Sequence, residues 1–166
     1  LSSSGHLEIG KALLDVDAEH SLIFTVVVHG ATVLSTIVVF YKDIIELFRG
    51  LFRFRWNEET QYISKLIASA IPVSIAGVFF REEIESYFNG NMVFVGSMLL
   101  LTAALLSFSY YKKNGNRKTN FIDSIVIGIA QALAVLPGIS RSGATISTGL
   151  ILGNKKETIA KFSFLM

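Results

Sequence analysis

Long apolar blocks, rather than apolar positions at helical or strand spacing, dominate the hydropathy pattern of this sequence. Three blocks approach the roughly 20 residues that a helix needs to cross a bilayer, and they cover residues 22–41, 63–80 and 92–111. Pro72 lies in the middle of the second block. A proline is tolerated there because neighbouring helices can satisfy the carbonyl that it frees. The pattern predicts three transmembrane helices.

Charges in the loops give these predicted helices an orientation. The loops after the first and third blocks are basic, whereas the loop between the second and third is mainly acidic. Since basic loops remain in the cytoplasm, we expect the first and last loops on the cytoplasmic side and the acidic loop outside. The charged residues are, in chain order, Lys42, Arg49, Arg53 and Arg55, then Arg81, Glu82, Glu83 and Glu85, then Lys112, Lys113, Arg117 and Lys118.

Residues 121–152 do not fit a single span, because Pro137-Gly138 interrupts the apolar run and Arg141 follows at once. One continuous helix would carry this break and an arginine near the middle of the membrane. Two short helices that meet at a buried turn explain the same residues better. Basic residues flank both ends, so the segment is predicted to be a re-entrant hairpin that enters and leaves on the cytoplasmic side.

The first fourteen residues resemble the second arm of another such hairpin. Ser2-Ser3-Ser4-Gly5 aligns with Ser140-Arg141-Ser142-Gly143, and the loop charges give the two motifs opposite orientations. Opposed motifs of this kind indicate an inverted-topology repeat with its site at the midplane. The fold class predicted for residues 1–166 is a single all-α integral membrane domain. A further transmembrane helix starts at residues 159–166, and both ends read as interior points of a longer protein.

Composition agrees with a membrane protein, since 51% of the 166 residues are hydrophobic, 17% are charged and the mean hydropathy is +0.54. Soluble domains carry about a quarter charged residues. A net charge of +2, with no basic run interleaved with aromatics, argues against a nucleic-acid partner. The absence of cysteine excludes disulfides, zinc-thiolate sites and thiol catalysis within this chain.

Arg141 is the most informative candidate for chemistry, because an arginine inside a membrane hairpin is costly and is usually functional. Its planar guanidinium suits bidentate binding of phosphate oxygens, and the helix start beside it offers free backbone N–H groups. Ser140, Ser142 and Thr145 add hydroxyls, and Gly143 allows close approach of a ligand to the backbone. The alternative is that Arg141 reaches the surface while the serines only cap a helix.

The SSSGH motif at the start of the chain is less specific alone. Ser3 and Ser4 could cap an ordinary helix. His6 is the residue near either motif that is suited to proton transfer or nucleophilic attack at neutral pH. Together with the arginine hairpin, the two motifs predict one membrane-embedded phosphate site.

These residues resemble the undecaprenyl-diphosphate phosphatase family known as the BacA-type, or bacitracin-resistance, phosphatases. The resemblance rests on SSSGHL at residues 2–7 and QALAVLPGISRSGATIS at residues 131–147, and it extends over the whole chain. It implies a multi-pass enzyme of the bacterial inner membrane. The expected reaction removes the terminal phosphate of undecaprenyl diphosphate and so recycles the lipid carrier of peptidoglycan synthesis.

The resemblance also implies roles for individual residues. Ser3, His6, Ser140, Arg141 and Thr145 match the family's site positions. Arg141 would hold the diphosphate. His6 would act as the general acid/base or as the nucleophile, and Ser3 is the rival nucleophile. The family's acidic pair lies upstream of Leu1, so its divalent cation, Mg or Ca, has no ligands in this chain. We therefore expect the 166-residue piece to be inactive by itself.

Two other interpretations of the pattern remain. Inverted repeats with broken helices are common in transporters, so a transporter or flippase for a phosphate-bearing lipid or anion is the first. A membrane scaffold whose polar motifs only pack helices is the second. The expected partners are a polyprenyl diphosphate lipid and the bilayer, and a homo-oligomer remains possible.

Overall fold

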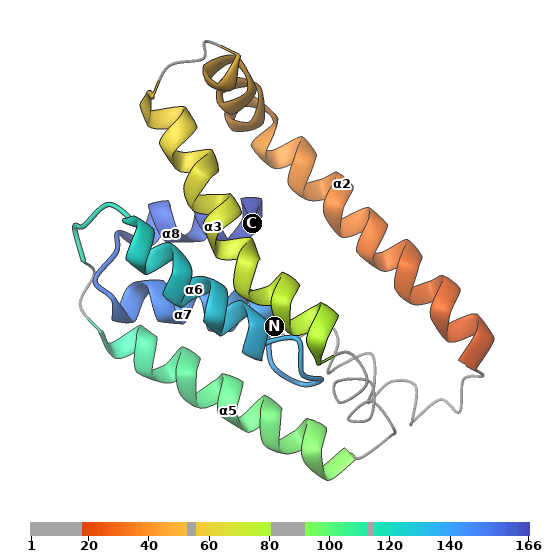
Figure 1. Cartoon of the computed structure of the whole chain (residues 1–166). Helices are drawn as coiled ribbons and strands as arrows, with labels where there is room; N and C mark the ends of the chain where they lie inside the picture. Colours follow the sequence, from red (N-terminus) through yellow and green to blue (C-terminus); the bar gives the residue numbers. More distant parts are fainter. Residues whose placement is uncertain (1–17, 53–55, 81–91, 113–114) are drawn as a thin grey trace. The chain divides into compact units, whose positions relative to one another are not determined.

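The computed structural model describes residues 18–52, 56–80, 92–112 and 115–166 (Figure 1). Within these ranges the regular elements are helices, with one isolated β-bridge between Arg117 and Asn154. The predicted all-α fold class is therefore confirmed for the described residues. The helices are α2 (Ala18–Leu51), α3 (Glu58–Phe79), α5 (Met92–Tyr111), α6 (Phe121–Leu133), α7 (Arg141–Ile151) and α8 (Lys156–Leu165).

Two of the described helices, α3 and α5, are long and apolar enough to cross a membrane. α5 has the same bounds as the predicted third span, and α3 begins five residues before the predicted second span, 63–80. Large apolar side chains on both helices are exposed, among them Val78 at 75%, Val93 at 81% and Leu100 at 74%. Water would be an unfavourable surrounding for such side chains, whereas lipid suits them. The predicted first span lies within α2 and stays a prediction.

The chain divides into two compact units, one within residues 10–64 and the other including residues 65–166, with the boundary inside α3. In the first unit, α2 is interrupted at Phe40, whose φ of −103° and ψ of 18° are not helical. Asn57 defines the start of α3. Its side chain accepts the Thr60 N–H at 2.8 Å and donates to the Gly50 carbonyl at 3.2 Å, so it caps one helix and binds the last turn of the other.

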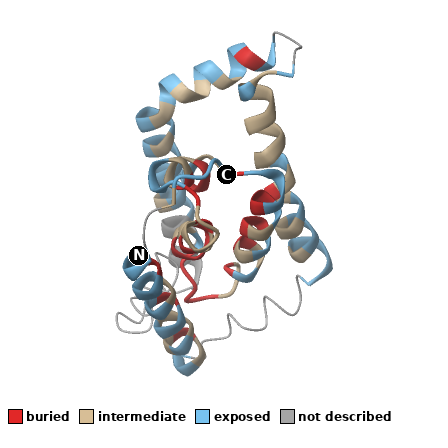
Figure 2. Ribbon diagram, turned by 90° about the vertical axis from the view of Figure 1, so that its left-hand side faces the viewer, coloured by how far each residue is buried: buried red, intermediate tan, exposed pale blue. Residues whose placement is uncertain are grey.

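In the second unit, α7 packs against α5, α6 and α8 (Figure 1). α5 and α7 run in the same direction with a nearly constant offset. Three hydrogen bonds define this register: Ser140 with Thr102, Ser147 with Ser109, and Lys112 with Ile151, whose offsets are 38, 38 and 39 residues. The turn between α6 and α7 therefore lies beside the middle of α5, and the end of α7 lies beside the end of α5. Figure 2 shows buried residues along α6, α7 and the turn.

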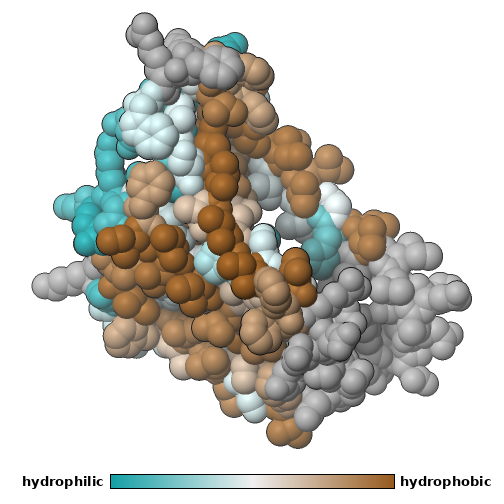
Figure 3. Space-filling model, viewed as in Figure 1, coloured by the Kyte–Doolittle hydropathy of each residue, from teal (hydrophilic) through white to brown (hydrophobic). Residues whose placement is uncertain are grey.

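Small residues allow the helices of this unit to approach one another closely. A Cβ on Gly128 of α6 would lie 2.3 Å from the Ser69 carbonyl oxygen of α3, and one on Gly149 of α7 would lie 2.1 Å from the Ile159 side chain of α8. Outward-facing residues are largely apolar, and in Figure 3 hydrophobic side chains form most of the surface seen over α5 and α6.

Candidate functional site

The turn between α6 and α7 is buried and is fixed by one glycine. Gly138 has a φ of +96°, a left-handed conformation that side chains disfavour. A Cβ at this position would lie 2.6 Å from the Val95 carbonyl oxygen of α5. Pro137 is fully buried beside it. The Pro-Gly pair thus ends α6 and brings the turn into direct contact with α5.

Thr102 of α5 connects the turn to the start of α7. Its hydroxyl accepts the Ser140 N–H at 3.2 Å and lies 3.0 Å from the Met98 carbonyl oxygen and 3.4 Å from that of Gly138. Thr102 is 5% exposed. Sequence reasoning missed this residue, although a hydroxyl in the middle of an apolar span was a signal that could have revealed it.

Ser140 is the N-cap of α7, as the simpler interpretation of the serines had it. Its hydroxyl accepts the Gly143 N–H at 3.1 Å, and its carbonyl accepts the Ala144 N–H at 2.8 Å. The N–H groups of Arg141 and Ser142, the first two residues of the helix, have no acceptor within a helix of this geometry. They point from the positive end of the helix dipole, which is an arrangement that suits an anion.

Arg141 is exposed, and no hydrogen bond or ion pair joins its guanidinium to another residue in the described part of the chain. Ser142 is half-buried, with its hydroxyl 3.5 Å from that of Ser140. A free guanidinium, a hydroxyl and two unpaired N–H groups therefore meet at one helix start. All are donors, so this corner of the fold is suited to an oxyanion.

Thr145 lies one turn further along α7 and is fully buried. Its hydroxyl lies 2.8 Å from the Arg141 carbonyl oxygen and 2.6 Å from the hydroxyl of Ser163 in α8. In this structure the Thr145 hydroxyl joins α7 to α8, and its assignment as a phosphate ligand stays a prediction.

The other half of the predicted site, Ser3, Ser4 and His6, lies outside the described residues. Within the described ranges, no three His, Asp or Glu side chains gather as a metal site would require. A cleft of about 510 Å³ is lined by residues of α2 and the start of α3 and holds none of the predicted site residues.

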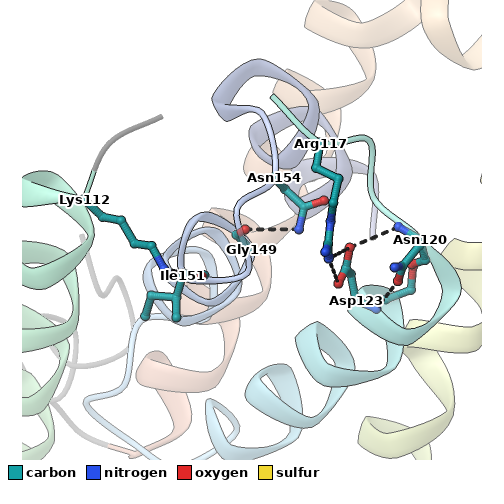
Figure 4. A network of polar contacts seen from close by, with 8 residues as sticks. Lys112, Arg117, Asn120, Asp123, Gly149, Ile151 and Asn154 are labelled. Atoms are coloured by element: carbon teal, nitrogen blue, oxygen red, sulfur yellow. Dashed lines mark hydrogen bonds and ion pairs between the residues drawn. The ribbon is translucent and has the colours of Figure 1, made fainter. Parts of the chain in front are cut away.

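The base of the α6–α7 hairpin is closed by backbone contact and by buried polar groups (Figure 4). The Arg117 N–H donates to the Gly153 carbonyl at 3.3 Å, and the Lys155 N–H donates to the Arg117 carbonyl at 3.1 Å. The Arg117 guanidinium binds both carboxylate oxygens of Asp123, at 2.7 and 2.9 Å. The two backbone bonds join the ends of the hairpin, and the ion pair fixes Arg117 against the first turn of α6.

The exposed apolar helices are suited to lipid. The start of α7, held by the buried turn, presents a guanidinium and free N–H groups. Together these features define a helical membrane protein with a candidate anion site. The family described as bacitracin resistance protein BacA matches residues 1–166. This chain belongs to that family.

Curated relatives agree over the whole chain. A Bacteroides fragilis protein named undecaprenyl-diphosphatase is 55% identical over 167 residues, which are 100% of this chain and 63% of its own length. Proteins of the same name from Christiangramia forsetii and Methanosphaera stadtmanae are 55% and 37% identical, over 100% of this chain and 64% and 66% of their own lengths. The chain thus spans just under two thirds of these relatives.

Proposed function

We propose that the full-length protein hydrolyses undecaprenyl diphosphate to undecaprenyl phosphate and phosphate, and so recycles the lipid carrier of peptidoglycan synthesis. The observation that carries this proposal is 55% identity, over the whole chain, to relatives named for that activity. The start of α7 supports it independently, because its donors suit the phosphate groups of such a substrate.

The proposed location is the bacterial plasma membrane, with α6 and α7 as a re-entrant hairpin. Thr102 lies ten residues after Met92 and nine before Tyr111. If α5 crosses the bilayer, Thr102 is about 15 Å from one end and about 14 Å from the other, close to the midplane of a hydrocarbon core about 30 Å thick. The hydrogen bond from Ser140 to Thr102 supports an anion site at mid-depth, as an inverted repeat would predict.

In the proposed mechanism, Arg141 binds the diphosphate and stabilises the charge on the phosphoryl group as it is transferred. The N–H groups of Arg141 and Ser142 and the Ser142 hydroxyl add donors. Gly143 is buried against the Ser140 and Thr102 side chains in this structure, so its part in phosphate binding stays a prediction. His6 or Ser3 attacks the terminal phosphorus, the bond to the bridging oxygen breaks, and undecaprenyl phosphate leaves. Water then cleaves the bond between the phosphoryl group and the nucleophile and releases the phosphate; where Ser3 is the nucleophile, His6 moves the protons.

A divalent cation, Mg or Ca, is the proposed cofactor. The start of α7 offers hydroxyls and a guanidinium but no carboxylate, whereas such cations prefer carboxylate oxygens. This part of the site is therefore proposed to hold the anion and not the cation. Loss of phosphate release after treatment with a chelator, and its return with Mg or Ca, would test the cofactor.

The function is tested with the purified full-length protein in detergent, by measuring phosphate release from undecaprenyl diphosphate. Arg141→Ala should lower kcat/KM by roughly 10²–10³-fold. Arg141→Lys should have a kcat/KM between those of the Ala variant and wild type, because lysine keeps the charge but lacks the planar group that binds two phosphate oxygens. Lys156→Ala, which removes an exposed cation outside the site, is the matched control. Wild-type protein that moves the lipid across vesicles without freeing phosphate would favour the transporter instead.

A further inference from the structure

An exposed apolar stripe follows the last part of α2. Tyr41, Ile45, Phe48 and Phe52 recur at steps of four, three and four residues, and they are 50%, 45%, 57% and 73% exposed. This spacing puts all four side chains on one face of a helix. Phe52 continues the helical turn, since its N–H donates to the Phe48 carbonyl at 3.1 Å.

The break at Phe40 separates this stripe from the first part of α2. In Figure 1 the segment after the break is viewed nearly along its axis, whereas the segment before it is viewed from the side. Before the break, exposed apolar residues such as Val33, Leu34 and Val38 occur on several sides of the helix. After it, all of them but Leu51, which is 40% exposed, lie on one face. A helix that is apolar all round suits a bilayer interior, and a one-sided helix suits its surface.

The other faces of this segment are accounted for within its own unit. Gly50 is buried, and a Cβ there would lie 2.4 Å from that of Glu59 in α3. The side next to the stripe is charged, with Lys42, Glu46 and Arg49 exposed along the cleft of about 510 Å³, whose rim also includes Tyr41 and Ile45 of the stripe. The Lys42 ammonium lies 5.8 Å from the centre of the Tyr41 ring. Among the large apolar side chains described in this segment, the stripe and Leu51 beside it are left without cover.

The net charge of this segment indicates which kind of surface covers the stripe. Residues 42–55 contain Lys42, Arg49, Arg53 and Arg55 against Asp43 and Glu46, which is four positive and two negative charges, or a net charge of +2. Long basic side chains beside an apolar stripe can extend to lipid phosphates while their stems stay among apolar groups. Anionic lipids of the cytoplasmic leaflet attract such segments, and the loop charges predict this segment on the cytoplasmic side.

We propose that residues 41–52 form a surface helix of the cytoplasmic leaflet, in which the stripe lies in the boundary between headgroups and acyl chains. Lys42 and Arg49 then contact the phosphates of anionic phospholipids. A phospholipid surface, rather than a protein, is the occupant because the segment continues directly from a helix whose own exposed side chains suit lipid.

The test places spin labels on the full-length protein in nanodiscs of phosphatidylethanolamine and phosphatidylglycerol. The described chain has no cysteine, so single cysteines are introduced after any others in the full-length protein are replaced. Phe48→Cys and Ile45→Cys carry labels on the stripe, and Glu46→Cys carries the matched label on the charged side. Accessibility to oxygen, which partitions into lipid, is compared with accessibility to a water-soluble nickel complex.

We expect the Phe48 and Ile45 labels to be accessible to oxygen and protected from nickel, and the Glu46 label to show the reverse. Equal nickel access at Phe48 and Glu46 would overturn the proposal. Protection from both reagents at Phe48 would also overturn it, because a protein, including a second copy of this chain, would then cover the stripe. Replacing phosphatidylglycerol by phosphatidylcholine should raise nickel access at Phe48, and no change would contradict the role given to Lys42 and Arg49.

Discussion

At the scale of single residues, Thr102 and Gly138 decide where the candidate anion site begins. Thr102 gives the Ser140 N–H an acceptor, and Gly138 lets the chain turn against α5 without a side chain in the way. Neither residue offers a group to a ligand in this structure. Thr102 and Gly138 instead position the start of α7, and therefore Arg141.

Thr102→Val keeps the shape of the side chain and removes the hydroxyl, so the buried Ser140 N–H loses its acceptor. We expect kcat/KM for phosphate release by the full-length protein to fall roughly tenfold, because small displacements of a binding group are costly in catalysis. Thr102→Ser should keep most of the activity, since it retains the hydroxyl. A Val variant as active as wild type would contradict this role.

Gly138→Ala introduces a Cβ where the Val95 carbonyl oxygen lies 2.6 Å away, and it does so at a φ of +96°. The matched control is Gly153→Ala, whose φ is +86° but whose Cβ would meet nothing within 4 Å. The control should cost about 1–2 kcal/mol for the left-handed backbone alone. Gly138→Ala should lower the thermal midpoint in detergent more than Gly153→Ala does. An equal loss in both variants would show that the contact between the new Cβ and the Val95 carbonyl oxygen is relieved.

At the scale of elements, hydrogen bonds and one ion pair hold the base of the α6–α7 hairpin, where the Thr119 hydroxyl and the Asn154 side-chain oxygen are buried without a partner among the described residues. Asn120 and Asp123 form a capping box, with the Asp123 N–H donating to the Asn120 side chain at 2.7 Å and the Asn120 N–H donating to the carboxylate at 3.2 Å. Asp123 is 2% exposed, and the Arg117 guanidinium is the cation that pairs with its carboxylate. Losing one partner of such a pair is costly because the other charge stays buried.

Arg117→Gln should therefore destabilise the protein by about 1–3 kcal/mol, measured by unfolding in mixed detergent micelles. The double variant Arg117→Gln/Asp123→Asn should recover part of that loss, since no buried charge is left without its partner. If the double variant is no more stable than the single one, the unpaired charge of Asp123 is not the cause of the loss.

At the scale of the whole molecule, the proposed re-entrant path of the α6–α7 hairpin predicts that both of its ends lie on the same side of the membrane. Asn116 and Lys155 lie at the two ends of the hairpin and are exposed. Cysteines at either position of the full-length protein should react with a membrane-impermeant maleimide from the cytoplasmic side alone. A cysteine replacing Glu83, in the acidic loop, is the control and should react from outside. Reaction of the Asn116 and Lys155 cysteines from opposite sides would mean that residues 121–152 cross the bilayer.

The sequence by itself determined the features that depend on local composition. Apolar blocks predicted α5 with its bounds and α3 to within five residues, and the Pro137-Gly138 pair predicted where α6 gives way to α7. These inferences succeed because helix formation in apolar runs, and its interruption by proline and glycine, are properties of neighbouring residues. The break of α2 at Phe40 carries no such signal, since no proline or glycine is present there.

Only the tertiary structure decided which polar groups remain available to a ligand. Serine and threonine hydroxyls look alike in the motif at residues 140–145, yet Ser140 caps its own helix, Thr145 is bonded to Ser163 of α8, and Ser142 stays partly open. Thr102, which accepts the Ser140 N–H, lies 38 residues before Ser140 in the sequence. A hydroxyl can bond to any acceptor or donor that folding brings within reach, and sequence separation gives no measure of that distance. The motif alone therefore predicted an anion site, and the packing of α5, α7 and α8 decided which of its residues can form one.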